Sequence, residues 1–194
     1  MPIMSTAEQV FCRSAPWRAF ASGVVLPWAL DGTPLRGDVL ELGSGSGAMA
    51  EGMMRTHPGI RLTATDLDAA MVRAAGARLS GLPDVTVEQA DVTALPFGDS
   101  AFDVVTSHLM LHHVIAWPAA LAEAARVLRP GGVLVGYDFT DTRFARLIHW
   151  ADRSPHRILA VDELWHGLEA VGFEDVSVRT SYRDHVMRFH ARRP

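Results

Sequence analysis

The chain has 194 residues, of which 48% are hydrophobic and 21% charged, and its formal net charge is -4 at pH 7. This balance is typical of a globular protein with one core, and it excludes a disordered or fibrous chain. The eighteen basic residues are all arginines spread along the sequence, so no basic block predicts binding to nucleic acid. Cys12 is the only cysteine, which excludes an intramolecular disulfide and makes the cytoplasm the expected compartment.

The beginning of the chain is less periodic than the rest. We expect residues 1–36 to form a helical or irregular lid on a core of residues 37–194, all within a single domain. The apolar stretch 19–30 is interrupted by Pro27 and Trp28 and is shorter than the roughly eighteen apolar residues that a spanning helix needs. Neither a leader sequence nor a membrane span is therefore predicted.

From residue 38 onward, strand-like apolar runs alternate with helical patterns, which is typical of a parallel sheet with helices on its faces. Two alternating segments at the end are joined so tightly that they predict an antiparallel hairpin. In chain order we expect strand 38–43, helix 47–58, strand 60–66, helix 69–79, strands 85–91 and 102–109, helix 118–128, strand 131–139, helices 142–151 and 161–172, and hairpin strands 173–181 and 182–191.

Residues at the expected helix ends support these boundaries. Asp68 can cap the second helix, and Pro118 lies in the first turn of the third, where its missing N–H costs nothing. Gly172 is placed to end the last helix. Ala160, before that helix, lacks the hydroxyl or carboxylate expected of a cap, which costs about 1 kcal/mol.

Three glycines, Gly43, Gly45 and Gly47, lie where the first strand meets the first helix, in the segment VLELGSGSGAMA. They remove side chains from the turn, so that the backbone can lie against a ligand beside the free N–H groups of the helix. The second strand ends in Asp66, whose carboxylate can accept hydrogen bonds from ribose hydroxyls. The pattern predicts a cofactor site, and a turn that only packs helix against strand is the structural alternative.

Further segments follow in order: ADVTALPF, FDVVTSHLMLHHV, RVLRPGGVLV and the closing hairpin. Together with LELGSGSG, they resemble the class I S-adenosylmethionine-dependent methyltransferases, particularly small bacterial members. The resemblance implies an α/β fold of three layers, Rossmann-like, with a seven-stranded sheet of order 3-2-1-4-5-7-6 in which only strand 7 is antiparallel. It implies methyl transfer from S-adenosyl-L-methionine, leaving S-adenosyl-L-homocysteine, to a small-molecule or lipid-like acceptor through oxygen, nitrogen or carbon.

The resemblance also implies a role for each motif residue. The glycines would admit the methionine end of the cofactor, Glu41 would orient the loop and, through water, the cofactor amino group, and Asp66 would hold the ribose. Leu67 would lie on the adenine, Asp91 would accept from its amine, and the Val92 N–H would meet a ring nitrogen. Glu41 paired with an arginine and Asp91 capping a turn are the alternatives. The implied cofactor-binding residues are Glu41, Gly43, Ser44, Gly45, Gly47, Asp66, Leu67, Asp91, Val92 and Ser107.

Three histidines, His108, His112 and His113, follow the fourth strand at the expected mouth of the acceptor pocket. An oxygen acceptor would gain from a base of near-neutral pKa, so all three are candidate catalytic residues. The alternative is that LHHV only shapes the loop. No carboxylate or cysteine accompanies them at a ligand-like interval, and no metal site is predicted.

Two more pairs of residues lie near the expected pocket. Tyr137 and Asp138 end the fifth strand, where they face either the acceptor or solvent. His149 and Trp150 lie on an expected helix that either covers the pocket or packs its Trp inward.

Two other classes of function stay open at this point. A nicotinamide oxidoreductase fits Gly43, Gly45 and Ala48, which satisfy the looser G-x-G-x-x-G/A pattern, but a chain without lysine has no Tyr-x-x-x-Lys pair. A non-catalytic cofactor-binding module is the second alternative, and the oligomeric state is open.

Overall fold

The computed structural model describes residues 19–142 and 157–194. Residues 1–18 of the expected lid and most of the expected helix 142–151, with His149 and Trp150, lie outside the described residues. In the ranges that are described, no helix is long and apolar enough to cross a membrane.

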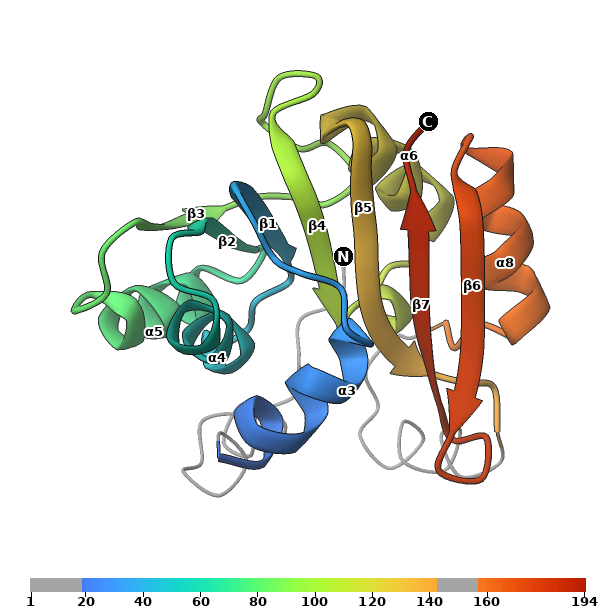
Figure 1. Ribbon diagram of the computed structural model, residues 1–194, viewed down its shortest axis with the longest axis horizontal. Helices are drawn as coiled ribbons and strands as arrows, with labels where there is room; N and C mark the ends of the chain where they lie inside the picture. Colours follow the sequence, from blue (N-terminus) through green and yellow to red (C-terminus); the bar gives the residue numbers. More distant parts are fainter. Residues whose placement is uncertain (1–18, 143–156) are drawn as a thin grey trace.

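Seven strands form one sheet of order β3-β2-β1-β4-β5-β7-β6, the order that the family resemblance implies (Figure 1). Neighbouring strands are parallel, except that β7 runs antiparallel to both β5 and β6. The predicted fold class, strand order and terminal hairpin are thereby confirmed. The strands are β1 (Asp38–Leu42), β2 (Arg61–Asp66), β3 (Val85–Gln89), β4 (Phe102–His108), β5 (Leu128–Phe139), β6 (Glu174–Ser181) and β7 (Val186–Arg192).

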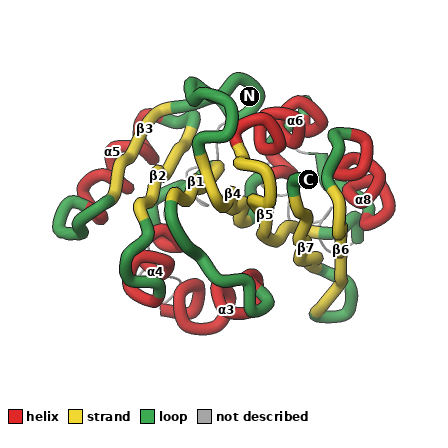
Figure 2. The backbone as a smooth tube through the Cα atoms, turned by 45° about the horizontal axis from the view of Figure 1, so that its top comes forward, coloured by secondary structure: helices red, strands yellow, loops and turns green. Residues whose placement is uncertain are grey.

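Helices cover both faces of the sheet and make three layers. Figure 2 shows α3 and α4 on one face and α6 and α8 on the other. The described helices are η1 (Ala21–Val25), α3 (Leu26–Leu30), α4 (Ala48–Thr56), α5 (Ala69–Leu79), η2 (Leu111–His113), α6 (Trp117–Val127) and α8 (Val161–Ala170).

The sheet separates two hydrophobic cores because successive strand side chains point to opposite faces. Val39 and Val104 pack with η1, α3 and α4. Their neighbours Leu40, Leu42 and Val105 pack with α6 and α8. These strands are therefore apolar on both sides, as parallel strands covered by helices are, and their polar groups gather at the strand ends.

The helix ends agree with the predicted signals. Asp68 caps α5, and its carboxylate accepts a hydrogen bond of 2.7 Å from the Ala70 N–H. Pro118 lies in the first turn of α6, and Gly172 follows α8 with φ +91°. Ala160 provides no side-chain cap for α8.

One strand begins earlier than predicted. β5 begins at Leu128 rather than Gly131, because a register shift in its pairing with β4 absorbs the Pro-Gly-Gly segment. Backbone bonds with Arg193 hold this irregular stretch: the Gly131 N–H donates to the Arg193 carbonyl, and the Arg193 N–H donates to that of Gly132. The contact comes from the far end of the chain, so the local sequence could not indicate it.

Replacing Asp68 by Ala should lower the free energy of unfolding by about 1 kcal/mol, because the first turn of α5 loses its cap. Ala160→Ser should raise it by up to about 1 kcal/mol, since Ala160 already has the extended backbone of a capping residue. Urea unfolding followed by circular dichroism measures both. Equal free energies for wild type and Asp68→Ala would contradict the assigned cap.

Candidate functional site

The glycine loop lies at the carboxyl ends of β1 and β2, and backbone bonds fix its path. The Ser44 N–H donates to the Thr65 carbonyl over 2.7 Å, and the Gly47 N–H donates to the Ser44 carbonyl over 2.9 Å. The Gly45 N–H donates to Asp66 Oδ2 over 2.8 Å. The loop is thus attached to the end of the neighbouring strand, at the edge where open α/β sheets bind ligands.

Two glycines of this turn have positive φ angles but different surroundings. Gly43 has φ +63°, and an added Cβ would collide with the side chain of Met110. Gly45 has φ +55°, but an added Cβ would meet nothing within 4 Å. The backbone at Gly45 therefore faces open space, which is where a ligand could lie against it.

Asp66 is held at the end of β2 by two backbone donors. Its Oδ2 accepts from Gly45, and its Oδ1 accepts from the Asp68 N–H over 2.9 Å. Burial raises the pKa of Asp66, although the hydrogen bonds from Asp68 and Gly45 act in the opposite direction. Each oxygen keeps acceptor capacity, so the carboxylate can take further donors such as hydroxyl groups.

Four buried polar side-chain atoms around the loop have no hydrogen-bond partner within the described part of the chain: Glu41 Oε2, Ser44 Oγ, Ser107 Oγ and His108 Nε2. They belong to adjacent segments, because Leu42 lies beside Ser107 in the register of β1 and β4. A buried polar group without a partner costs about 1–3 kcal/mol, so native structures usually satisfy such groups. The mixture of donors and acceptors fits a polar ligand such as the amino-acid end of S-adenosylmethionine.

Glu41 and His108 form a buried pair across β1 and β4. Glu41 Oε1 lies 3.1 Å from His108 Nδ1, and the two residues are 1% and 8% exposed. The His108 ring also lies 5.8 Å from that of Tyr137. The contact holds the imidazole through Nδ1 and leaves Nε2 for another partner. Both residues were predicted to lie at the site, but the predicted partners of Glu41 were the loop, the cofactor amino group or an arginine, and not a histidine.

His112 is part of a second buried pair. Its Nδ1 lies 2.5 Å from Asp138 Oδ1, and its backbone N–H donates to Asp138 Oδ2 over 3.2 Å. Burial alone would raise the pKa of Asp138, but attraction to His112 and hydrogen bonds from His112 and Phe139 outweigh burial and lower it. The half-buried His113 lies beside His112, with ring centres 4.0 Å apart. The His112–Asp138 pair holds η2 at the end of β5. Asp138 faces the protein interior rather than solvent.

The residues implied for the adenine lie at the ends of β2 and β3. Asp91 Oδ1 accepts from the N–H and the hydroxyl of Thr93, so Asp91 does cap a turn, and the Thr93 N–H lowers its pKa. Its Oδ2 accepts from none of the described residues. Val92 is buried and Leu67 is half-buried. The turn thus leaves one carboxylate oxygen of Asp91 for a ligand.

The donor set around the site gives no indication of a metal. Among residues 19–142 and 157–194, no group of three or more His, Cys, Asp or Glu side chains could hold a metal ion.

Comparison with known proteins adds sequence relatives. Residues 40–136 match the family model described as methyltransferase domain. The ubiquinone/menaquinone biosynthesis C-methyltransferase UbiE of Desulfotalea psychrophila is 36% identical over 124 residues, which cover 64% of this chain and 48% of that protein. The malonyl-(acyl-carrier protein) O-methyltransferase of Geobacter sulfurreducens is 31% identical over 151 residues, covering 72% of this chain and 57% of that protein.

A solved structure, a SAM dependent methyltransferase from Aquifex aeolicus, superimposes with a TM-score of 0.78 over 97% of this chain and 98% of that chain. Its sequence identity is 17%, so the likeness concerns the fold. The chain spans about half the length of the curated relatives it matches. On the match of the family model and the sheet order together, the chain belongs to the methyltransferase domain family, with the fold of the class I S-adenosylmethionine-dependent methyltransferases.

Proposed function

We propose that this chain transfers a methyl group from S-adenosylmethionine to a small-molecule or lipid-like acceptor. The observation that carries the proposal is the set of four unpartnered buried polar atoms on β1, β4 and the glycine loop, together with the open space at Gly45. The names of two curated relatives support a small or lipid-like acceptor. One is a ubiquinone/menaquinone biosynthesis C-methyltransferase, and the other is a malonyl-(acyl-carrier protein) O-methyltransferase. Their names differ in the accepting atom, so that atom stays open.

The cofactor-holding residues are proposed on the geometry described above. S-adenosylmethionine supplies an activated methyl group on a sulfonium, so the protein has to bind, align and exclude water. Ser44, Ser107 and the unpaired oxygen of Glu41 would hold the polar methionine end. The two oxygens of Asp66 would accept from the ribose hydroxyls. Leu67, Asp91 and Val92 would surround the adenine, and Gly43 and Gly47 shape the loop around Gly45.

We propose His108 as the base for an acceptor that loses a proton. Glu41 would hold the Nδ1–H of the neutral imidazole, which leaves the lone pair of Nε2 to receive the acceptor's proton. Glu41 then stabilises the imidazolium by charge. His112 and His113 are proposed as positioning residues, because the carboxylate of Asp138 binds His112 through both its ring and its backbone.

The remaining expectations stay predictions. We expect the chain to act in the cytoplasm and without nucleic acid, as its single cysteine and dispersed arginines indicate. The segment 1–36 is expected to help form the acceptor pocket. The part of this segment from residue 19 onward packs Leu26 and Ala29 into the core beside α4.

Asp66→Asn should weaken binding of S-adenosylhomocysteine by about 10- to 100-fold, because charge-assisted hydrogen bonds to the ribose become neutral ones. Isothermal titration calorimetry measures the dissociation constant. Asp84→Asn, at an exposed turn before β3, is the matched control and should bind as wild type does. Unchanged affinity in Asp66→Asn would remove the ribose role.

Affinity for S-adenosylhomocysteine should fall as the pH falls through the raised pKa of Asp66. Above that pKa the free protein already carries the carboxylate that accepts from ribose, whereas below it a proton must leave before binding. Calorimetry from about pH 4.5 to pH 8 should show this slope in wild type and a smaller one in Asp66→Asn. Parallel slopes in the two proteins would assign the pH dependence to another group.

Substitutions in the two histidine pairs should have different effects: a change at His108 should lower turnover, and a change at His112 should lower stability. With an oxygen acceptor, His108→Gln should lower kcat by about 10²- to 10⁴-fold, while S-adenosylhomocysteine still binds. His112→Asn should instead lower the free energy of unfolding by about 3 kcal/mol, because Asp138 loses the partner of its buried charge.

The assay measures S-adenosylhomocysteine release across a panel of quinols, carboxylic acids and amines. Turnover by His108→Gln equal to wild type would assign His108 to a structural role. Cofactor binding without turnover of any acceptor would favour the non-catalytic module. Absence of binding would overturn the proposal altogether.

A further inference from the structure

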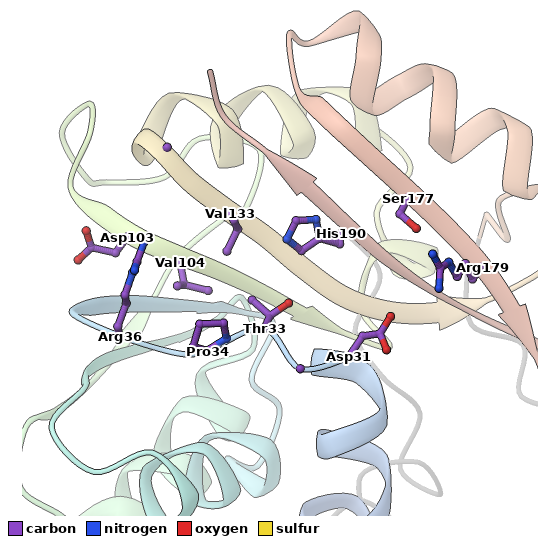
Figure 3. A pocket seen from close by; sticks show the side chains of 12 residues that line it. Asp31, Thr33, Pro34, Arg36, Asp103, Val104, Val133, Ser177, Arg179 and His190 are labelled. Carbon is purple, nitrogen blue, oxygen red and sulfur yellow. The ribbon is translucent and has the colours of Figure 1, made fainter.

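We propose that a groove on the α3 side of the sheet binds a metabolite-sized anion through Arg179 and His190. The groove has a volume of about 420 Å³, which is within the usual range for small-molecule sites. It lies between the segment that joins α3 to β1 and the strands β5, β7 and β6 (Figure 3). Its floor includes Val104, near the beginning of β4, whereas Ser107 and His108 lie at the other end of that strand.

The register of the hairpin brings two arginines face to face. Arg179 of β6 lies directly opposite Arg188 of β7, and Ser177 lies directly opposite His190. Residues two apart on a strand share a face, so all four belong to the α3 side. Like charges that lie directly opposite each other destabilise a sheet. Negative charge near the pair would therefore stabilise this part of the hairpin.

The nearest carboxylate serves only one of these two arginines. Asp31 Oδ2 lies 3.1 Å from Arg188 Nη2, and Arg188 Nη1 donates to the Trp28 carbonyl over 3.3 Å. Arg188 Nε is buried without a partner. Arg179 has no hydrogen-bond or ion-pair partner among the residues that the structure describes. One carboxylate thus faces two guanidinium groups.

The other acid that lines the groove is also engaged. Asp103 Oδ2 accepts from Arg129 Nη1 over 2.7 Å and from the Asp38 N–H over 2.8 Å. Arg36 lines the same end of the groove and has no partner within the described ranges. Both acids of the groove are therefore bound to other groups, and cationic donors are in excess.

The donor types indicate the ligand. A guanidinium binds a carboxylate or phosphate group through two parallel hydrogen bonds. Figure 3 shows Arg179, Ser177 and His190 together at the β6–β7 end of the groove, with Thr33 across from His190. We infer that the anionic group lies at this end, and that the rest of the ligand extends over Val104 toward the Arg36 end.

The test uses the intact protein, titrated with sodium phosphate or sodium acetate at constant ionic strength in sodium chloride. The readout is the ring resonance of His190 in the NMR spectrum, assigned by its loss in His190→Gln. In wild type, the His190 resonance should shift saturably with at least one of the two anions. The anion that causes the shift then shows whether the anionic group of the ligand is a phosphate or a carboxylate. Absence of a saturable shift with both would overturn the proposal.

Two variants separate the groove from general charge effects. Arg179→Gln should weaken binding of the responding anion by about tenfold or more, because the substitution removes the bidentate donor. In chloride alone it should unfold at a higher urea concentration than wild type, since the opposed charges are gone. Arg183→Gln, on the exposed turn of the same hairpin, is the matched control and should leave both measurements unchanged. Equal dissociation constants in the two variants would overturn the proposal.

A parallel titration contains excess S-adenosylhomocysteine, so that anion binding at the glycine loop is kept apart from binding in the groove. The His190 response should persist there. Its loss would assign the anion to the loop and overturn the proposal. The inference does not rest on methyl transfer, because a protein that fails to bind the nucleoside can still bind an anion at Arg179.

Discussion

The hydrogen bond from the Gly45 N–H to the Asp66 carboxylate is the contact on which the candidate site depends. It joins the turn after β1 to the end of β2, and it fixes the backbone at Gly45, where an added Cβ would meet nothing within 4 Å. Burial raises the pKa of this carboxyl group, and the hydrogen bonds from two backbone N–H groups act against that rise. A ligand with two vicinal hydroxyls would add donors to the same oxygens, so loop shape and ligand binding are stabilised by one group.

Much of the fold followed from local patterns, whereas the contacts that give the site its chemistry did not. The Asp68 cap, the Pro118 turn and the closing hairpin each depend on a few neighbouring residues, and all three were predicted. The pair of Glu41 with His108 joins residues 67 positions apart. It requires β1 to lie beside β4, which strand periodicity does not specify and the family resemblance gave only as a strand order. Which side chains meet between β1 and β4 is therefore known only from the structure.

The two acid–histidine pairs have the same chemistry but different surroundings. In both, a buried carboxylate holds a histidine through Nδ1. Asp138 also binds the backbone of His112, so that pair anchors a loop and uses both carboxylate oxygens. Glu41 keeps one oxygen without a partner, and His108 keeps Nε2. Unused hydrogen-bonding capacity in a buried place distinguishes a residue available for a ligand from one committed to structure.

The antiparallel direction of β7 sets where the last basic residues of the chain lie along the sheet. The parallel strands bring their carboxyl ends, with the glycine loop, Asp66 and His108, to one edge. Because β7 runs the other way, the residues close to the end of the chain pair with the early part of β5, as in Val133 with Arg192 and Val135 with His190. A parallel last strand would have carried these basic residues toward the glycine loop. Arg179 and Arg188, in contrast, lie in the same row of the sheet as Tyr137 and His108, so β5 and β7 separate the cationic end of the groove from His108 across the sheet and not along the strands.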